Sequence, residues 1–228
     1  LIWVIPWLLF YRRPPASAGE QPVLAYQHGN PWREVFRRRE IWLLTVGRLL
    51  TDPVWYFYLF WFPKYLNDSR HLSLVEAASI VWIVYLAADL GCLFGGYLSG
   101  RFIQKGCQPV RSRIRVMALA AIVLPLSPLV AYASSPLVAV LLASTAAFAH
   151  LCWQVSLSAA IVDLFPQRLV GTVFGLVAAG SGLGGMISTN LVGRLVSSYS
   201  YTPVFVAMGL LHPIAFLLVR TLRSSEAE

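Results

Sequence analysis

Three charged residues lie inside otherwise apolar stretches of the sequence. Arg48 and Asp52 are four positions apart, so on a helix they share one face and can form an ion pair. Asp89 lies in the next apolar stretch, and both aspartates fall roughly 16–18 Å from the same end of their stretches at ~1.5 Å per residue. Charges in hydrocarbon are costly and usually functional. We expect an Arg48–Asp52–Asp89 network, which either fixes two helices together or acts as a proton relay or gate.

A second group combines a histidine, an aromatic ring and an amide. His150, Trp153 and Gln154 lie three and four positions apart, so they share one face of a helix. A ring beside an amide suits a polyhydroxylated ligand, because the ring covers an apolar face while the amide binds hydroxyls or a carboxylate. Hydrogen bonding between helices is the alternative. Ser156 points elsewhere and ranks below Gln154. The predicted substrate-binding wall consists of Tyr56, Trp153, Gln154, Ser156 and Asn190.

The remaining reactive side chains show no spacing typical of a catalytic or metal site. Cys92, Cys107 and Cys152 are isolated, without a CxxC pair, and the four histidines are scattered through the sequence. The sequence contains no clustered nucleophile or carboxylate pair. We therefore expect no catalytic residue, no metal and no cofactor, and a protein that is not an enzyme.

The composition indicates that the elements carrying these residues are membrane-spanning helices. Only 12% of the 228 residues are charged, against roughly 25% in a soluble domain, and the mean hydropathy is +0.65. Long uncharged runs can each cross a ~30 Å hydrocarbon core. We predict an all-α membrane protein, a six-helix bundle, and exclude a soluble enzyme, a nucleic-acid module and a disulfide scaffold. The six apolar stretches are about 41–63, 74–100, 116–133, 136–162, 169–193 and 203–219.

Glycines recur in pairs four positions apart within these stretches. The pairs are 91 and 95, 96 and 100, 171 and 175, and 180 and 184. Small residues at this spacing let two helix backbones approach closely in a membrane. Helix packing is therefore the function that we expect for these glycines.

The basic residues predict the orientation of the bundle in the membrane. Fourteen of the 18 lysines and arginines lie in loops on one side of the six stretches, and three lie on the other. Basic loops remain in the cytoplasm, so we expect a multi-pass protein of the inner (plasma) membrane with its linker and C-terminus in the cytoplasm. This orientation explains the net charge of +8 without a nucleic-acid partner.

The apolar stretches also define the expected domain boundaries. Residues 1–10 are apolar but too short to span, and Arg12 and Arg13 follow them instead of preceding them as in a signal peptide. We interpret 1–10 as the tail of a preceding transmembrane helix, so that the chain is a fragment. Residues 11–40 are then a cytoplasmic linker, 41–222 the six-helix transmembrane domain, and 223–228 a cytoplasmic tail.

Several of these segments resemble one family of transporters. Residues 51–66 (TDPVWYFYLFWFPKYL) resemble the seventh transmembrane helix of hexuronate transporters, which belong to the anion:cation symporter family of the major facilitator superfamily. Other segments resemble the eighth helix (85–100), the tenth helix and its exit (His150, Trp153 and 163–176) and the opening of the twelfth helix (201–212). Gln154 and Ser156 depart from the family, which often has a small residue and an asparagine at these positions.

The resemblance implies the carboxy-terminal half of a twelve-helix transporter, with substrate bound between two halves near the midplane. It implies proton-coupled symport of a sugar acid such as a hexuronate or aldonate, with a small organic anion, a proton, the lipid bilayer and the missing amino-terminal six-helix half as partners. The family's cationic anchor and proton-carrying acid lie largely in that other half. The alternatives are a transporter of another organic anion, such as a dicarboxylate or aromatic acid, and a membrane half that binds a partner without transporting.

Overall fold

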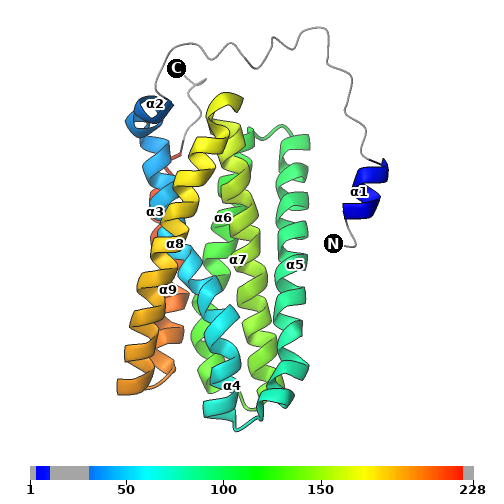
Figure 1. The fold of residues 1–228 in the computed structure, drawn as a ribbon, viewed down its shortest axis with the longest axis vertical. Helices are drawn as coiled ribbons and strands as arrows, with labels where there is room; N and C mark the ends of the chain where they lie inside the picture. The colour runs from blue at the N-terminus through cyan, green and yellow to red at the C-terminus, as the bar shows by residue number, and fades with distance from the viewer. Residues whose placement is uncertain (1–3, 11–30, 223–228) are drawn as a thin grey trace. The chain divides into compact units, whose positions relative to one another are not determined.

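The computed structural model describes residues 4–10 and 31–222, and within these ranges every regular element is helical (Figure 1). The chain divides into two compact units, residues 1–30 and 31–228. The first contains α1 (Val4–Phe10), at the place of the expected transmembrane tail. The predicted linker residues 11–30 and tail residues 223–228 lie outside the described ranges, so both assignments stay predictions.

The second unit consists of α2 and six helical columns, some of which join two or three elements. The elements are α2 (Pro31–Arg37), α3 (Arg39–Tyr56), the π-helix η1 (Phe57–Trp61), α4 (Phe62–Arg70), α5 (Leu74–Gln104), α6 (Pro109–Val123), the 3-10 helix η2 (Leu124–Tyr132), α7 (Pro136–Leu164), α8 (Gln167–Ser198) and α9 (Thr202–Val219). Within the described part, α3, η1 and α4 follow one another directly along the chain, as do α6 and η2. The predicted all-α fold is confirmed.

Five helical segments of the described residues are long and apolar enough to cross a membrane. They are 74–104, 109–132, 136–164, 167–198 and 202–219. The first predicted stretch, 41–63, lies in the column of α3, η1 and α4, which contains Arg48 and Asp52 and changes from an α-helix to a π-helix at Phe57. This column is therefore irregular in the middle, and it is the one of the six described columns that is not among the five apolar spans.

Local sequence signals set several helix ends. Ser73 begins α5 with a capping box, in which its hydroxyl accepts the Glu76 N–H at 3.2 Å and Glu76 accepts the Ser73 N–H at 2.8 Å. Ser135 caps α7 by a single hydrogen bond, in which its hydroxyl accepts the Val138 N–H at 3.3 Å. His71 ends α4 in the left-handed conformation, with φ of 58°. These signals lie at one end of the bundle, opposite the end where α5 leads into α6.

Glycines bring two pairs of helices into backbone contact. A Cβ on Gly91 of α5 would collide with the Phe148 carbonyl oxygen of α7, and a Cβ on Gly184 of α8 with the Leu49 carbonyl oxygen of α3. Gly95 and Gly180 lie in the same two interfaces, whereas Gly96, Gly100, Gly171 and Gly175 have no described atom within 4 Å of an added Cβ. The helix-packing interpretation therefore holds for half of the glycine pairs, and the bundle contains two tight pairs, α5–α7 and α3–α8.

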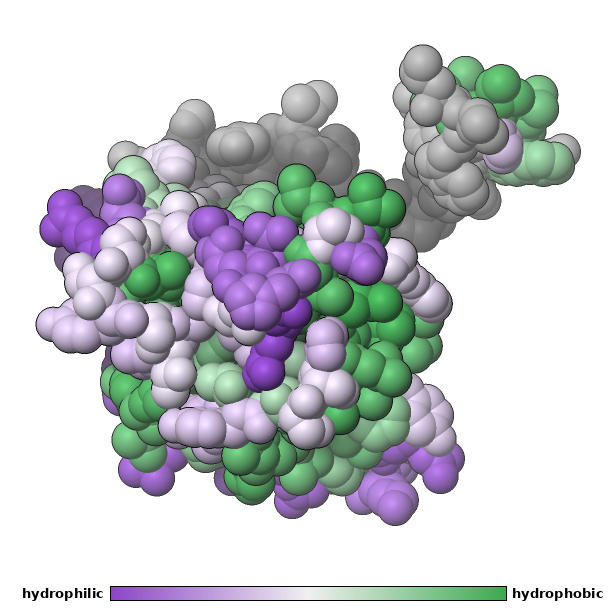
Figure 2. All heavy atoms as spheres, turned by 90° about the horizontal axis from the view of Figure 1, so that it is seen from below, coloured by the Kyte–Doolittle hydropathy of each residue, from purple (hydrophilic) through white to green (hydrophobic). Residues whose placement is uncertain are grey.

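The two ends of the bundle carry different side chains. We call the end defined by Arg38, Lys105, Arg113, Arg168 and Arg220 the basic end. The other end contains α4 and the turns after it; Figure 2 looks at this end and shows hydrophilic residues gathered on it, with strongly hydrophobic residues beside them. Polar ends joined by apolar helices are typical of a bundle that spans a bilayer.

Candidate functional site

The predicted ion pair forms within α3, between Arg48 and Asp52. The Arg48 Nε donates to Asp52 Oδ2 at 2.7 Å, and the side chains of the two residues are 15% and 6% exposed. Gln154 of α7 approaches from the facing helix. With its amide oxygen turned to the guanidinium, Gln154 accepts hydrogen bonds from Arg48 Nη1 at 2.5 Å and from Nη2 at 2.6 Å. A carboxylate and an amide thus hold one cation in the interior of the bundle.

One oxygen of this cluster has no partner. Asp52 Oδ1 is buried and makes no hydrogen bond within the described part of the chain. A buried polar atom without a partner is unfavourable by roughly 1–3 kcal/mol. In the Arg48–Asp52–Gln154 cluster the guanidinium therefore has strong hydrogen bonds, whereas one oxygen of the Asp52 carboxylate has none.

Asp89 is not part of this cluster, so the expected three-residue network is a pair in the structure. Asp89 is exposed and makes no hydrogen bond or ion pair with any described residue. The reason is the placement of α5, which packs chiefly against α7 and not against the part of α3 that carries Arg48. Tyr85, one turn before Asp89, reaches the α3 column instead, where its hydroxyl donates to the Leu59 carbonyl at 3.3 Å.

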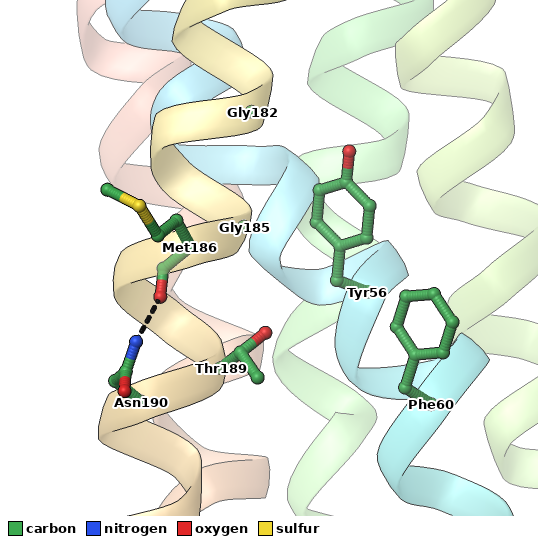
Figure 3. Close-up of a pocket in the computed structure, with 7 residues that line it drawn as sticks. All are labelled: Tyr56, Phe60, Gly182, Gly185, Met186, Thr189 and Asn190. Atoms are coloured by element: carbon green, nitrogen blue, oxygen red, sulfur yellow. Dashed lines mark hydrogen bonds between the residues drawn. The ribbon is translucent and has the colours of Figure 1, made fainter.

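Two predicted site residues meet in a hollow of about 420 Å³ between the α3 column and α8. Tyr56 and Asn190 both line it. The Tyr56 hydroxyl lies 3.4 Å from Ser181 Oγ, and Asn190 donates to the Met186 carbonyl at 2.9 Å. Figure 3 shows the lining residues Tyr56 and Phe60 on one column and Gly182, Gly185, Met186, Thr189 and Asn190 on α8.

A glycine makes room for the aromatic side of this hollow. A Cβ on Gly185 would lie 2.5 Å from Tyr56 Cε2. Tyr56 also stacks on Phe60, with ring centroids 6.2 Å apart and planes inclined by 5°. The hollow therefore presents two aromatic faces opposite a helix surface of small and polar residues, which suits a ligand with one apolar and one hydroxylated face.

Two of the other three predicted wall residues, Trp153 and Ser156, lie in the protein interior. Trp153 is completely buried, and its ring packs edge-on against His212 of α9 with centroids 5.2 Å apart. Ser156 is 1% exposed, and its hydroxyl donates to the Cys152 carbonyl at 2.8 Å. Because α7 packs against α5, α6 and α3 at once, few of its positions can face an open space. Gln154 is half-buried.

Sequence reasoning missed a residue that joins this interior group. His150 Nδ1 lies 3.1 Å from His212 Nε2, and both histidines are buried. Trp55 of α3 stacks on the other side of His150, with centroids 6.1 Å apart and planes inclined by 2°. The signal was available: His212 is the one titratable residue in the stretch 203–219, so the argument used for Arg48 applies to it equally.

Ion pairs at the basic end fix the ends of the helices. Arg113 of α6 donates from Nε to Asp163 Oδ2 of α7 at 2.9 Å. Glu34 of α2 accepts from Arg168 Nη1 and Nη2 of α8 at 2.7 and 2.9 Å. The hydrogen bonds from Arg168 hold the pKa of Glu34 below its ordinary value, against the opposing effect of desolvation. Across residues 4–10 and 31–222, no three His, Cys, Asp or Glu side chains gather as metal ligands.

Comparisons with known proteins place this geometry in a family. The family described as Major Facilitator Superfamily matches residues 1–126, which is more than half of the chain. The "Hexuronate transporter" of Escherichia coli (strain K12) is 26% identical over 96% of this chain and 54% of its own length. The "D-galactonate transporter" of Escherichia coli O6:H1 is 25% identical over 90% and 47%, and the "Galacturonate transporter" of Dickeya chrysanthemi 29% identical over 64% and 47%.

The chain spans about half the length of the curated relatives it matches. The five apolar helices and these relatives agree on a multi-pass membrane protein. The same superfamily is indicated by two further observations. One is the sequence resemblance in the first, second, fourth and sixth apolar stretches, and the other is the all-helical bundle. The chain belongs to the Major Facilitator Superfamily.

Proposed function

We propose that this chain is the carboxy-terminal half of a secondary transporter that imports a sugar acid, such as a hexuronate or aldonate, by proton symport. The observation that carries the proposal is the Arg48 guanidinium, held between Asp52 and Gln154 inside an otherwise apolar bundle. Arginine binds carboxylates through two parallel hydrogen bonds. The carboxylate of a bound ligand can therefore compete with Asp52 for the Arg48 guanidinium. The names of the relatives support a sugar acid as that ligand.

The hollow beside α8 supplies the second part of a sugar-acid site. Tyr56 and Asn190 offer a hydroxyl and an amide to substrate hydroxyls, while the Phe60 ring covers an apolar face of the sugar. Because Tyr56 lies one turn after Asp52 on the same helix, one ligand can reach both the hollow and the charged cluster. Gln154 would bind either the carboxylate or the adjoining hydroxyl. Trp153 and Ser156 would then support the wall from inside without touching the ligand.

The remaining parts of the proposal concern placement. The basic end faces the cytoplasm of the inner membrane, residues 1–10 end a preceding helix, and 11–40 link two halves. A six-helix amino-terminal half covers the face that carries the hollow, as in other two-half transporters. We call the protein that joins both halves the complete transporter.

The test is uptake by the complete transporter in vesicles, screened with galacturonate, glucuronate, galactonate and glucarate with and without a pH gradient. Uptake of one of these acids driven by an acidic exterior supports the proposal. Arg48→Gln should abolish uptake, and Arg48→Lys should restore it only in part because lysine lacks the planar fork. Lys64→Gln, which removes an exposed cation from the same column, is the matched control and should transport normally.

Two results would contradict this function. Transport of dicarboxylates or aromatic acids, with none of the four sugar acids, would assign a different organic anion. Uptake by the 228-residue chain alone would contradict the two-half arrangement, because one half supplies one wall of a central cavity. We expect the chain alone to show no substrate-dependent proton flux above that of empty vesicles.

A further inference from the structure

The histidine pair behind the charged cluster is a site that the proposed sugar-acid contacts do not use. His150 on α7 and His212 on α9 are joined by one hydrogen bond, Nδ1 to Nε2, at 3.1 Å. His150 is 2% exposed and His212 completely buried. Two neutral imidazoles in this arrangement share one proton between the facing nitrogens and keep one further nitrogen each. The pair is therefore a buried group with an open position for a proton.

Two nitrogens of the pair, His150 Nε2 and His212 Nδ1, lie outside the shared hydrogen bond. His212 Nδ1 is buried and has no hydrogen-bond partner among the described residues, and the same holds for Trp153 Nε1 beside it. In the tautomer in which His150 Nδ1–H donates to His212 Nε2, His212 Nδ1 also carries hydrogen and His150 Nε2 carries a free lone pair. A proton that arrives at His150 Nε2 leaves the hydrogen bond to His212 intact. His212 then acts as the acceptor that stabilises the imidazolium.

Charged groups on α3 face this pair. Asp52 and Arg48 both act electrostatically on His150, and His150 acts in turn on His212. Trp55, three residues after Asp52, covers the His150 ring by parallel stacking. Tyr85 of α5 meets Trp55 edge-on and is one ring removed from the pair. The titratable and charged groups around His150 are thus the two members of the Arg48–Asp52 ion pair, His212 and, more distantly, Tyr85.

Charge balance links the histidine pair to the cluster. With Arg48 paired to Asp52, the interior is neutral, and a proton on His150 would add an uncompensated charge at high cost. If an anion takes Arg48, Asp52 loses its partner, and the interior then contains one negative charge too many. A proton on His150 restores neutrality. Anion binding therefore favours protonation of the pair, and protonation favours anion binding by the same factor.

We propose that the His150–His212 pair is a proton-binding site coupled to anion binding at Arg48 through Asp52. This inference rests on the proposed function, and it identifies a proton-binding site of the symporter within this carboxy-terminal half. One sugar-acid carboxylate replaces Asp52 on the Arg48 guanidinium, and one proton from water binds His150 Nε2. No covalent bond other than this N–H forms, and the proton leaves with the anion on the other side of the membrane. The net charge of the site stays at zero throughout.

The test separates exchange from accumulation in vesicles that contain the complete transporter. Exchange of galacturonate for galacturonate needs no net proton movement, whereas accumulation against a gradient does. One pH unit supports about tenfold accumulation for one proton per anion. His150→Asn keeps a donor at the position of Nδ1 for His212 and removes Nε2. We expect this variant to retain exchange and to lose the accumulation driven by the pH gradient.

His71→Asn is the matched control. His71 is an exposed histidine with φ of 58°, and asparagine tolerates this left-handed conformation. It should accumulate galacturonate as the unchanged protein does. If His150→Asn also accumulates normally, the histidine site is wrong while proton symport stands. If the unchanged protein transports no galacturonate with protons, the proposed function itself is wrong.

A measurement without substitution covers the case in which His150→Asn does not fold. Nitrogen-15 NMR of labelled histidines in the complete transporter distinguishes imidazole from imidazolium. Addition of galacturonate at constant pH should move one histidine signal, that of an imidazole hydrogen-bonded to a second histidine, toward the imidazolium position. Signals that stay unchanged at saturating galacturonate would overturn the proposal.

Discussion

The contact between α5 and α7 is made by backbone atoms at glycines, whereas the contact between α3 and α7 is made by long side chains. Along α5–α7, Gly91 and Gly95 let the backbones touch at Phe148 and Cys152. Between α3 and α7, long polar and aromatic side chains meet, among them Arg48 with Gln154 and Trp55 with His150. Backbone contact at glycine fixes a helix pair tightly, because no side chain can change its rotamer to relieve a shift. Side-chain contacts can exchange partners while the helices remain in place.

This difference indicates which parts of the bundle can move. We therefore expect the glycine-tight pairs α5–α7 and α3–α8 each to move as one body, with the polar cluster at the junction between the two pairs. A ligand that takes Arg48 from Asp52 changes the contacts across this junction and leaves the contacts inside each pair unchanged. The substrate-dependent step of the proposed transporter is therefore expected between the pairs.

The largest expected effect comes from removing one charge at the junction. Asp52→Asn leaves Arg48 without its counter-ion, and breaking a buried pair costs about 3–5 kcal/mol. Thermal unfolding in detergent should show a clear loss of stability. Lys64→Gln breaks the exposed i, i+4 pair with Asp68 but leaves the Tyr201–Asp68 hydrogen bond in place, so it should cost less than about 1 kcal/mol. Asp89→Asn changes a carboxylate with no described partner and should change stability least. A large loss of stability in this variant would support the expected Arg48–Asp52–Asp89 network.

A second test concerns the contacts inside the pairs. Gly91→Ala and Gly184→Ala place a Cβ against a carbonyl oxygen of the facing helix, and overpacking of this kind costs about 1–3 kcal/mol. The controls are Gly96→Ala and Gly182→Ala on the same two helices, where an added Cβ meets no described atom within 4 Å. They should be neutral or stabilising by up to about 1 kcal/mol, since alanine favours helix. Equal melting temperatures for all four variants would contradict rigid pairs.

The third prediction concerns ligand affinity at the junction and in the hollow. Gln154→Ala and Tyr56→Phe each remove one hydrogen-bonding group from the proposed site, a loss of about 1–3 kcal/mol or roughly 5- to 150-fold. Uptake by the complete transporter should show a raised half-saturating sugar-acid concentration at normal surface expression. Ser156→Ala, which removes a hydroxyl that donates within α7, should leave affinity unchanged. If Ser156→Ala fails while the other two variants behave normally, the site lies on another face of α7.

The smallest expected effect is a pH dependence at the basic end, away from both kinds of contact. Arg168 lowers the pKa of Glu34 below the ordinary glutamate value of 4.5. The Glu34 carboxylate therefore contributes fully to holding α2 on α8 at any pH above 4.5. This contribution is lost as the pH falls through the lowered pKa of the folded state. Fluorine NMR of labelled Trp32 should report loosening of α2 on acidification. Glu34→Gln should remove this transition, whereas Glu40→Gln should preserve it.

The sequence predicts contacts along one helix better than contacts between helices. Arg48 and Asp52 pair at 2.7 Å, as their i, i+4 spacing predicts, because helix geometry alone fixes their separation. Asp89 has a similar predicted depth but no contact with Arg48, since depth does not determine which helices are neighbours. The six columns follow from hydropathy, but η1 within the first column has no signal that we recognised.

The same distinction explains the outcome for the wall residues. His150, Trp153 and Gln154 do share one broad face of α7, but a helix in the middle of a bundle meets different neighbours along one face. Trp153 therefore packs on His212 while Gln154 reaches Arg48. Tyr56 and Asn190 line one hollow because Gly184 and Gly185 bring α8 close to α3. The place at which two distant segments meet is a tertiary property, and neither hydropathy nor spacing contains it.

The polar character of the α3 column also bears on how the protein is made. During synthesis a segment enters the bilayer from the translocon according to its own hydrophobicity, and arginine or aspartate near the centre of a segment opposes entry by about 2.5–3.5 kcal/mol each. Residues 39–70 carry both charges and are not among the five segments that are apolar enough by composition. Their stable residence in lipid then depends on α8, which emerges from the ribosome about a hundred residues later. We expect this column to enter last, after its partner helix has been made.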